Sequence, residues 1–483
     1  MDKKYEILII CTVILSLCFV GAASAKTWYV DDDGGSDFIR IQDAITNASV
    51  SDTIIVRDGT YTENIDVDKR LCIQAENGSA TVQAANTSDS VFEVTADYVN
   101  ISGFTVKNSN SSAGISLNGV GHCNISNNNV SNNFCAIYSS SSKFNIMAEN
   151  TLVDNVGAAI CLYNESDNNR VIGNNISNNS LGVWIGYYGS SSHNIISDNA
   201  ITGTKEYGAI NVYGNVSTNN RITDNYVSFN NGTGIFLGSL SNNNIISNNN
   251  VSFNEGVGIH LHSNDNNIVA SNTANSNNGG GISLDYSRNN AVINNNANYN
   301  RYYGYGISLY SSSYNKISGN NASSNNAGGI SLFHLSSNNT VINNTANYNA
   351  LVGGIDITIS CDNNTIRNNT ASFNGGWGIS LLSSDYNTIT GNYANSNSNT
   401  GILTGLSNNN TVERNEANFN DFAGMQFISS SYNTMTGNYA NSNDNMGIIL
   451  YNLSSNNIIK NNTANSNHFD GIGLWYSSVV SNL

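Results

Sequence analysis

The sequence contains no proline, and only 11% of its 483 residues are charged. An average soluble chain has roughly 5% proline and roughly 25% charged residues, so both shortages need a structural cause. Lysine and arginine together number 18 against 34 aspartates and glutamates, which gives a net charge of -16. A nucleic-acid-binding surface needs clustered basic residues, so the composition argues against a nucleic acid as partner.

Cysteine and methionine are also scarce, with seven and five residues. No C-x-x-C pair occurs, so the sequence predicts neither a zinc site nor a disulfide framework. Cys123, Cys135 and Cys161 are near enough in sequence for one bridge, and buried free thiols are the alternative interpretation. The sequence points to no cofactor.

Residues 1–25 have the pattern of a secretory signal. Lys3 and Lys4 precede an apolar stretch over 7–20, and Ala23, Ser24 and Ala25 form a cleavage motif. We therefore predict cleavage after Ala25 and a protein that is secreted or held at the cell surface. The apolar stretch is short for a bilayer span, and no later segment is apolar enough to span a membrane, so we expect no transmembrane segment in the mature chain.

An internal repeat dominates the rest of the chain. A Gly-Ile-x-Leu-like tetrad recurs 16 times between Ile115 and Ile472, in 15 steps with a mean of 23.8 residues. Between tetrads runs the pattern N-x-[VI]-x-x-N-x-[AVIL]-x-x-N. Each repeat thus holds three short segments with alternating apolar residues, which is typical of strands and too short for a hairpin sheet. Stacked coil on coil, these segments predict an all-β fold, a three-sided parallel β-helix.

The composition agrees with this fold. An interior strand pairs on both edges, so proline would remove a ladder hydrogen bond in every coil. Asparagine tolerates the left-handed backbone of tight corners, and stacked asparagines can hydrogen-bond up a column. The 94 asparagines are therefore interpreted as scaffold. From Ala274 onward the inward residue of the third segment is alanine, which predicts a narrower cross-section on that side.

The two ends of the solenoid differ. Residues 26–50 are predicted to hold an N-terminal strand and a capping helix over 37–48, with Ser36 as its N-cap. The β-helix then fills 51–483. The chain stops soon after its last tetrad with no amphipathic helix, so the final coil is expected to be open and is a candidate for self-association.

The N-terminal block carries a family resemblance. It comprises Trp28 to Gly35 (WYVDDDGG), Ile41 to Ile45 (IQDAI), Asp52 to Val56 (DTIIV), Gly59 to Tyr61 (GTY) and Glu63 to Val67 (ENIDV). This block resembles the opening of NosD-type right-handed β-helix proteins, a pectin-lyase-like group of carbohydrate-binding and sugar-hydrolase domains that is common on archaeal cell surfaces. The resemblance implies that the β-helix is right-handed and that the protein lies outside the cell. It also implies copper handling as one function, although six histidines and few methionines offer few copper ligands.

Aromatic residues recur in the two x positions around each tetrad, which alternate outward from one sheet. Flat rings on an exposed face suit sugar stacking, with asparagine and serine binding hydroxyls. We therefore predict binding of a glycan or a cell-envelope polymer, or a structural role in the envelope. The candidate ligand-binding residues are Tyr163, Trp184, Tyr213, Phe236, His260, His262, Asp285, Tyr303, Tyr310 and Phe333.

His260, His262 and Asp285 form the sharpest cluster. The histidines share a strand face, and Asp285 is expected beside His262 one coil later. An acid–base pair and a weak metal site are the functional interpretations, and a solvated His–Asp contact is the structural alternative. His262 and Asp285 are the catalytic candidates for the alternative function, a polysaccharide lyase or glycoside hydrolase. Asp285 and Asp356, the two carboxylates predicted on this face, lie three coils apart, too far for paired glycosidase carboxyls.

Overall fold

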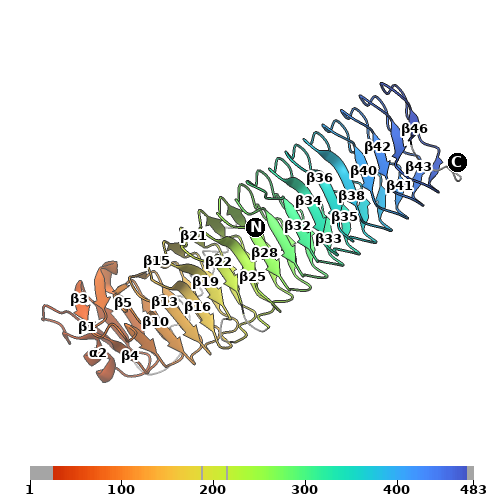
Figure 1. Cartoon of the computed structure of the whole chain (residues 1–483). Helices are drawn as coiled ribbons and strands as arrows, with labels where there is room; N and C mark the ends of the chain where they lie inside the picture. The colour runs from red at the N-terminus through yellow and green to blue at the C-terminus, as the bar shows by residue number, and fades with distance from the viewer. Residues whose placement is uncertain (1–24, 187–188, 214–215, 476–483) are drawn as a thin grey trace.

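The computed structural model describes residues 25–186, 189–213 and 216–475. The predicted signal segment lies outside these ranges except for Ala25, so its cleavage stays a prediction. Figure 1 shows one elongated stack of coils running from the N-terminal strands to β46. All strand pairs are parallel, each strand pairing with its equivalents in neighbouring coils. The prediction of a three-sided parallel β-helix is confirmed.

Sheet A has 19 strands and forms one side of the solenoid. Its strands are β1 (Thr27–Val30), β2 (Thr53–Val56), β5 (Cys72–Ala75), β8 (Asn100–Ser102), β11 (Asn124–Ser126), β14 (Ile146–Ala148), β17 (Arg170–Ile172), β20 (Ile195–Ser197), β23 (Arg221–Thr223), β26 (Ile245–Ser247), β29 (Ile268–Ala270), β31 (Ala291–Ile293), β33 (Lys316–Ser318), β35 (Thr340–Ile342), β37 (Thr365–Arg367), β39 (Thr388–Thr390), β41 (Thr411–Glu413), β43 (Thr434–Thr436) and β45 (Ile458–Lys460).

Sheet B, the second side, has nine strands. They are β3 (Gly59–Thr62), β6 (Ala80–Gln83), β9 (Thr105–Lys107), β12 (Asn129–Ser131), β15 (Thr151–Val153), β18 (Asn175–Ser177), β21 (Ala200–Thr202), β24 (Tyr226–Ser228) and β27 (Asn250–Ser252). A 3-10 turn, η1 (Glu76–Gly78), lies between β5 and β6. Beyond β27 the side continues as one bridged residue per coil, from Thr273 to Thr463.

Sheet C contains the tetrads from β10 onward and carries the predicted site. Its strands are β4 (Ile65–Val67), β7 (Phe92–Val94), β10 (Ala113–Asn118), β13 (Cys135–Ser140), β16 (Ala158–Tyr163), β19 (Leu181–Ile185), β22 (Gly208–Val212), β25 (Thr233–Leu237), β28 (Ile259–His262), β30 (Ile282–Asp285), β32 (Ile307–Tyr310), β34 (Gly328–Phe333), β36 (Gly353–Thr358), β38 (Trp377–Leu382), β40 (Ile402–Gly405), β42 (Met425–Ile428), β44 (Ile448–Tyr451) and β46 (Ile472–Trp475).

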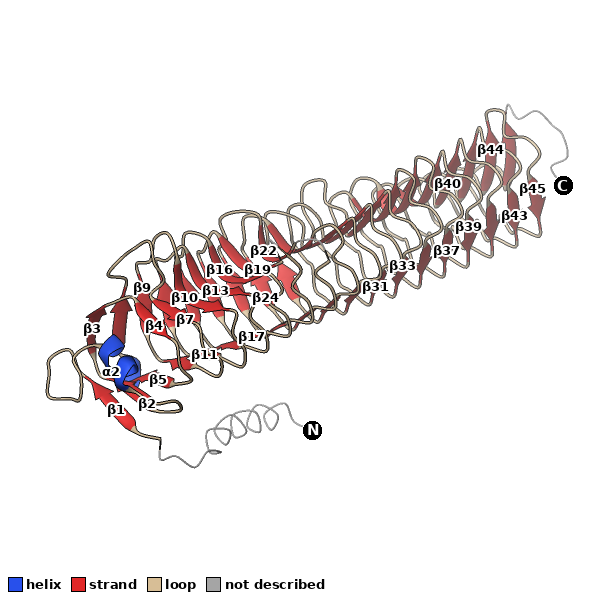
Figure 2. Cartoon of the chain, turned by 90° about the horizontal axis from the view of Figure 1, so that it is seen from below, coloured by secondary structure: helices blue, strands red, loops and turns tan. Residues whose placement is uncertain are grey.

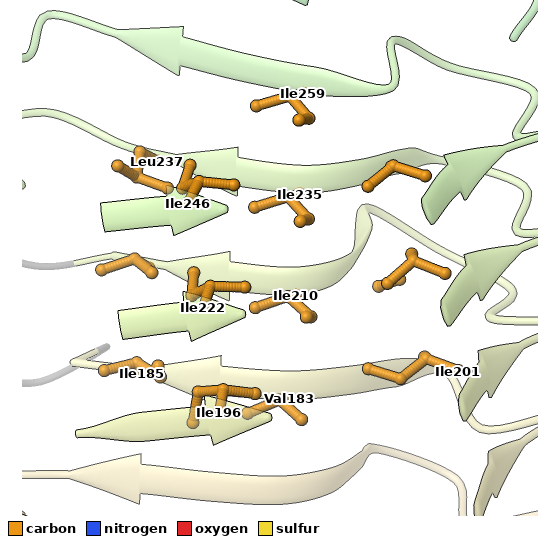
Figure 3. Close-up of a cluster of buried hydrophobic side chains, with 14 of the residues drawn as sticks. Val183, Ile185, Ile196, Ile201, Ile210, Ile222, Ile235, Leu237, Ile246 and Ile259 are labelled. Carbon is orange, nitrogen blue, oxygen red and sulfur yellow. The ribbon is translucent and has the colours of Figure 1, made fainter. Parts of the chain in front are cut away.

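The core is a set of aliphatic columns. Val183, Ile210, Ile235 and Ile259 stack in successive coils of sheet C, each with no exposed surface (Figure 3). Each coil buries its apolar residues only against the coils above and below it, so burial accumulates with the number of coils. The third side changes at Ala274. A Cβ added to Gly234, before the change, would contact Cγ1 of Val251. A Cβ added to Gly281, after it, would lie 2.8 Å from the Cβ of Ala297. The alanine column is thus buried on this side, and the narrower cross-section stays a prediction.

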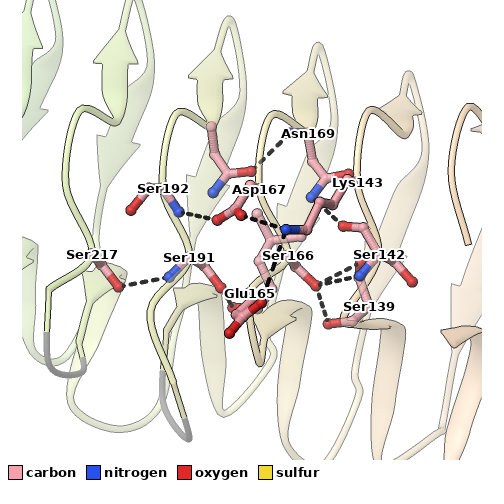
Figure 4. Close-up of polar contacts among 12 residues, drawn as sticks. Ser139, Ser142, Lys143, Glu165, Ser166, Asp167, Asn169, Ser191, Ser192 and Ser217 are labelled. Carbon is pink, nitrogen blue, oxygen red and sulfur yellow. Dashed lines mark hydrogen bonds and ion pairs between the residues drawn. The ribbon is translucent and has the colours of Figure 1, made fainter. Parts of the chain in front are cut away.

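Asparagine ladders join the coils inside the corners. In one column Asn272, Asn295 and Asn320 are buried, and each backbone N–H donates to Oδ1 of the next asparagine at 2.9 Å. Serines take over this role at another corner, where the N–H of Ser142 donates to Oγ of Ser166 and that of Ser191 to Oγ of Ser217 (Figure 4). The asparagines of these ladders are therefore scaffold, as the sequence predicts.

A short helix covers the first coil. Helix α2 (Ile41–Asn47) lies over the N-terminal end of the stack (Figure 2) and buries Ile41, Ala44 and Ile45. The predicted helix over 37–48 is too long, because Phe38 pairs with Val30 in a β-bridge. Ser36 as N-cap is wrong. The carboxylate of Glu63, one coil away, accepts the N–H groups of Ile41 and Gln42 at 3.0 and 3.1 Å.

Candidate functional site

Sheet C carries a continuous row of rings on its outer face. Successive rings contact each other from Tyr138 in β13 to His334 just after β34, with centroid separations of 5.2 to 6.4 Å. We call this row the ring face. Its members are Tyr138, Tyr163, Trp184, Tyr213, Phe236, His260, His262, Tyr286, Tyr310, Phe333 and His334.

The ring face unites nine of the ten predicted ligand-binding residues, counting Asp285, which hydrogen-bonds His260. Tyr286 and His334 were missed because they follow their strands at left-handed corners, with φ of 52° and 50°. The tetrad pattern gives no sign of which way such corner side chains turn. Tyr213 and Phe333 are each 38% exposed, so both offer ring surface to a ligand.

Tyr303 lies apart from the ring face. It is 86% exposed on the lengthened loop before β32. Its neighbour Tyr305 packs against Gly328 in the next coil. A Cβ added to that glycine would lie 2.7 Å from the Tyr305 ring. Tyr305 lies beside Asp356, which is buried and accepts a hydrogen bond from Ser380. The prediction that Asp356 lies exposed on this face is therefore wrong. Burial raises its pKa to about 6.

The histidine cluster has a different pairing from the predicted one. His262 and Asp285 are register partners, yet the hydrogen bond joins Nε2 of His260 to Oδ2 of Asp285 at 2.9 Å, across the diagonal. Ser283 donates to Oδ1 of Asp285 at 3.1 Å. Burial alone would raise the pKa of Asp285, but the hydrogen bonds from His260 and Ser283 and the nearby imidazoles lower it below its usual range. The carboxylate is thus held ionised.

The same cluster could hold a divalent cation. His260, His262 and Asp285 offer ligand atoms that lie within 4.8 Å of one another. Two imidazoles and a carboxylate suit Zn²⁺ or Cu²⁺. The soft thioethers that select Cu⁺ are not on the surface, since the described methionines Met147, Met425, Met435 and Met446 are all buried. The donors therefore fit a borderline divalent ion and do not fit Cu⁺ handling.

A groove lies at the N-terminal end of the ring face. Its volume is about 690 Å³, within the roughly 300–1,000 Å³ of small-ligand sites. Serines and Asn118 form a polar floor, and Tyr138, Tyr163 and Trp184 supply aromatic surface. The lining residues are Ser90, Glu93, Ser111, Ser112, Ala113, Ser116, Asn118, Phe134, Cys135, Tyr138, Ser140, Tyr163 and Trp184.

Two carboxylates at this end were missed by sequence reasoning. Asp66 in β4 and Glu93 in β7 are register partners in adjacent coils of sheet C, and Glu93 lines the groove. Adjacent strands lie about 4.8 Å apart. The signal was present in the alternation of Ile65, Asp66 and Val67, which turns Asp66 outward. The repeat obscured it, because the first coils lack the Gly-Ile-x-Leu tetrad.

A pair of thiols lies at the groove, which Cys135 lines. Sγ of Cys135 and Sγ of Cys161 are 3.1 Å apart on adjacent coils, and both residues are buried as free cysteines. Of the three cysteines considered for one bridge, these two lie in contact. Cys123 is buried elsewhere, and burial raises its pKa to about 11.

The described chain ends at β46, where Ile472 and Trp475 are each 46% exposed. Residues 476–483 lie outside the described part, so self-association through the last coil stays a prediction. Within the described residues, no helix has the length and apolarity needed to cross a membrane.

Comparison with known proteins agrees with the fold. A model described as a right handed beta helix region matches residues 207–346 and 348–482, and one described as periplasmic copper-binding protein (NosD) matches 45–230. A cell surface glycoprotein of Methanothermus fervidus is 34% identical over 135 residues, which cover 27% of this chain and 22% of that protein. The match thus spans about a fifth of that relative's length.

Solved structures show weaker likeness. The Dettilon tailspike protein (gp208) has a TM-score of 0.42 at 16% identity, covering 65% of this chain and 59% of that one. Pectate lyase Pel9A has a TM-score of 0.39 at 14% identity, covering 63% and 80%. The repeats, the three parallel sheets and the family-model matches together place this chain in the right-handed β-helix family, with a NosD-type N-terminal half.

Proposed function

We propose that this protein is exported, is displayed at the cell surface and binds glycans along the ring face without catalysing a reaction. The carrying observation is the unbroken row of rings over successive coils of sheet C. Ring faces pack against the C–H faces of sugars, while the neighbouring serines and asparagines offer hydrogen bonds to hydroxyls. The groove beside Tyr138 would hold the end of such a chain. The cell-surface relative and the predicted signal segment support the location.

A glycan array probed with residues 26–483 tests this proposal. The strongest ligand is then titrated against the double variant Tyr213→Ala/Phe333→Ala. Each stacked ring contributes about 0.5–1.5 kcal/mol beyond its buried area, so we expect binding to weaken about 10- to 100-fold. Tyr226→Ala is the matched control, because Tyr226 is 43% exposed but lies on sheet B. Equal losses in the control and the double variant, or no bound glycan, would refute the proposal.

A polysaccharide-active enzyme is the second candidate, and the Asp66–Glu93 pair favours it. Retaining glycosidases place two carboxyls about 5–5.5 Å apart, close to the spacing of adjacent coils. Release of reducing ends from neutral and acidic polysaccharides measures this activity. Glu93→Gln should abolish it, while Glu206→Gln on an exposed loop should leave it unchanged. Loss of activity in His262→Ala or Asp285→Ala, with Glu93→Gln active, would move the reaction to the histidine cluster.

A further inference from the structure

A second set of rings follows the corner between sheets B and C. One residue per coil occupies this corner with φ between 55° and 60°. Consecutive members are one coil apart. The N–H of Phe229 donates to the carbonyl of Phe253, and that of Phe253 donates to the carbonyl of Asn275, just before Ser276. From Phe229 onward the corner column consists of Phe229, Phe253, Ser276, Tyr299, Ser324, Tyr348, Phe373, Ser396, Phe419, Ser442 and Ser466.

Where two aromatic residues follow each other in this column, their rings stack. Phe229 and Phe253 have centroids 5.3 Å apart at an interplanar angle of 10°, and Tyr348 and Phe373 are 5.1 Å apart at 9°. A serine in the column therefore removes one ring from a stack. Adjacent coils are about 4.8 Å apart, so the rings flanking a serine are about 10 Å apart, the room for one further ring.

The gap at Ser324 is a defined slot. Tyr299 and Tyr348 wall it from the coils on either side, and they are 62% and 61% exposed. The cavity has a volume of about 440 Å³ and is lined by Tyr299, Asn300, Arg301, Tyr302, Ser324, Asn325, Asn326, Tyr348 and Ala350. The slot is thus lined by two tyrosines on neighbouring sides and by polar side chains.

Polar groups at the rim could hold a ligand in place. The side-chain amide of Asn326 donates to the carbonyl of Tyr302, which fixes the lengthened loop against the slot. Arg301 is exposed there, and no carboxylate of the described chain forms an ion pair with it. Its guanidinium is therefore available as a hydrogen-bond donor to a ligand.

We propose that the Ser324 slot binds one pyranose ring of a glycan, sandwiched between Tyr299 and Tyr348. A pyranose has two C–H faces and an edge of hydroxyls, which match the two aromatic walls and the polar rim. An aromatic side chain from a second copy of this chain would use the walls but not Arg301 or Asn326, so the sugar is the better fit. The ligand class is that of the proposed function but the surface is different, so either proposal can fail alone.

Oxidative footprinting of tyrosines by mass spectrometry tests the slot directly. The probes are hexasaccharides of glucose, N-acetylglucosamine and glucuronate, each with the mature chain. We expect at least one probe to reduce oxidation of Tyr299 and Tyr348 about threefold or more. Tyr226 on sheet B serves as the internal reference. Failure of every probe to protect the two tyrosines overturns the proposal.

Ser324→Phe fills the slot from within. Phe373 adopts the same backbone conformation in this column, so the variant should fold and its thermal midpoint should not fall. It should abolish ligand protection of Tyr299 and Tyr348. Ser442→Phe is the control, because its neighbours Phe419 and Ser466 place a ring on one side only.

The variants also separate the alternatives. The double variant Tyr213→Ala/Phe333→Ala on the ring face should leave the protection of Tyr299 and Tyr348 unchanged. Loss of that protection in the double variant would show that the ligand binds sheet C and not the slot. Sedimentation of the ligand-free chain provides the last test. A dimer that Ser324→Phe dissociates would show that the slot binds a second copy of this chain, and would overturn the sugar-binding proposal.

Discussion

Asn295→Ala tests whether the asparagine ladders hold the coils together. The side chain of Asn295 is 1% exposed and makes four hydrogen bonds. Its Oδ1 accepts the N–H of Asn272 at 2.9 Å and the side-chain amide of Asn272 at 3.0 Å. Its own amide donates to the carbonyl of Val269 at 2.9 Å and to Oδ1 of Asn320 at 3.0 Å. Alanine removes all four and keeps the hydrogen bond from the backbone N–H of residue 295 to Oδ1 of Asn320.

The expected loss is large for a single polar residue. A buried hydrogen bond contributes about 1 kcal/mol net, and a buried group left without a partner costs about 1–3 kcal/mol. Four lost bonds therefore predict a loss of about 4 kcal/mol or more in the free energy of opening these coils. That corresponds to about a thousandfold change in the opening equilibrium.

Native-state hydrogen exchange is the suitable assay, because a solenoid can open locally and need not unfold in one step. Amides of the coils containing Asn272 to Asn320 should exchange about a thousandfold faster in the variant. Those of β14, several coils away, should change little. Asn296→Ala is the control, since Asn296 is exposed beside the mutated site. Exchange that is less than threefold faster than in this control would refute the ladder as a stabilising element.

Burial raises the pKa of Asp356 to about 6 from an ordinary value of 3.8. The folded state therefore binds the proton of Asp356 more tightly than the unfolded state does. Protonated Asp356 contributes about 3 kcal/mol to the free energy of unfolding. This contribution is present below pH ~4 and is lost as the pH rises through about 6. Asp356→Asn should remove this pH dependence of the unfolding midpoint; an unchanged profile would contradict the assigned burial. Oxidised glutathione should convert Cys135 and Cys161 to a disulfide, releasing two reduced glutathiones, and raise stability by about 3 kcal/mol; a non-reducing peptide map that leaves both thiols free would contradict their contact. Zn²⁺ should raise the thermal midpoint of the chain, and His262→Ala or Asp285→Ala should remove that rise; a rise of equal size in both variants would place the ion elsewhere.

The repeat made most of the fold predictable. The three segments per coil, the asparagine columns and the alanine change at Ala274 could all be read from the sequence, because a solenoid repeats one local solution and each coil contacts only its neighbours. The capping helix was predicted in place but not in length. Its N-terminal hydrogen bonds come from Glu63, a residue one coil away that no local capping pattern identifies.

The candidate site was predicted only in part. Counting positions in the tetrads placed Tyr213, Phe236 and Phe333 on one face. The same positions do not predict that Tyr305 lies beside Asp356. Nor do they predict that Asp285 hydrogen-bonds His260 and not its register partner His262. These outcomes depend on side-chain rotamers and on loop paths between coils, which the period does not encode.

The sequence by itself determined that this chain forms a stack of β coils, because the absence of proline, the asparagine columns and the apolar alternation all repeat with one period. The tertiary structure alone decided which distant residues meet at one surface. Parallel stacking brings residues about 24 positions apart within about 4.8 Å of each other, so Asp66 pairs in register with Glu93, and Tyr299 and Tyr348, two coils apart, line one slot on either side of Ser324. Small differences in loop length shift such neighbours, and only the folded chain fixes their registration.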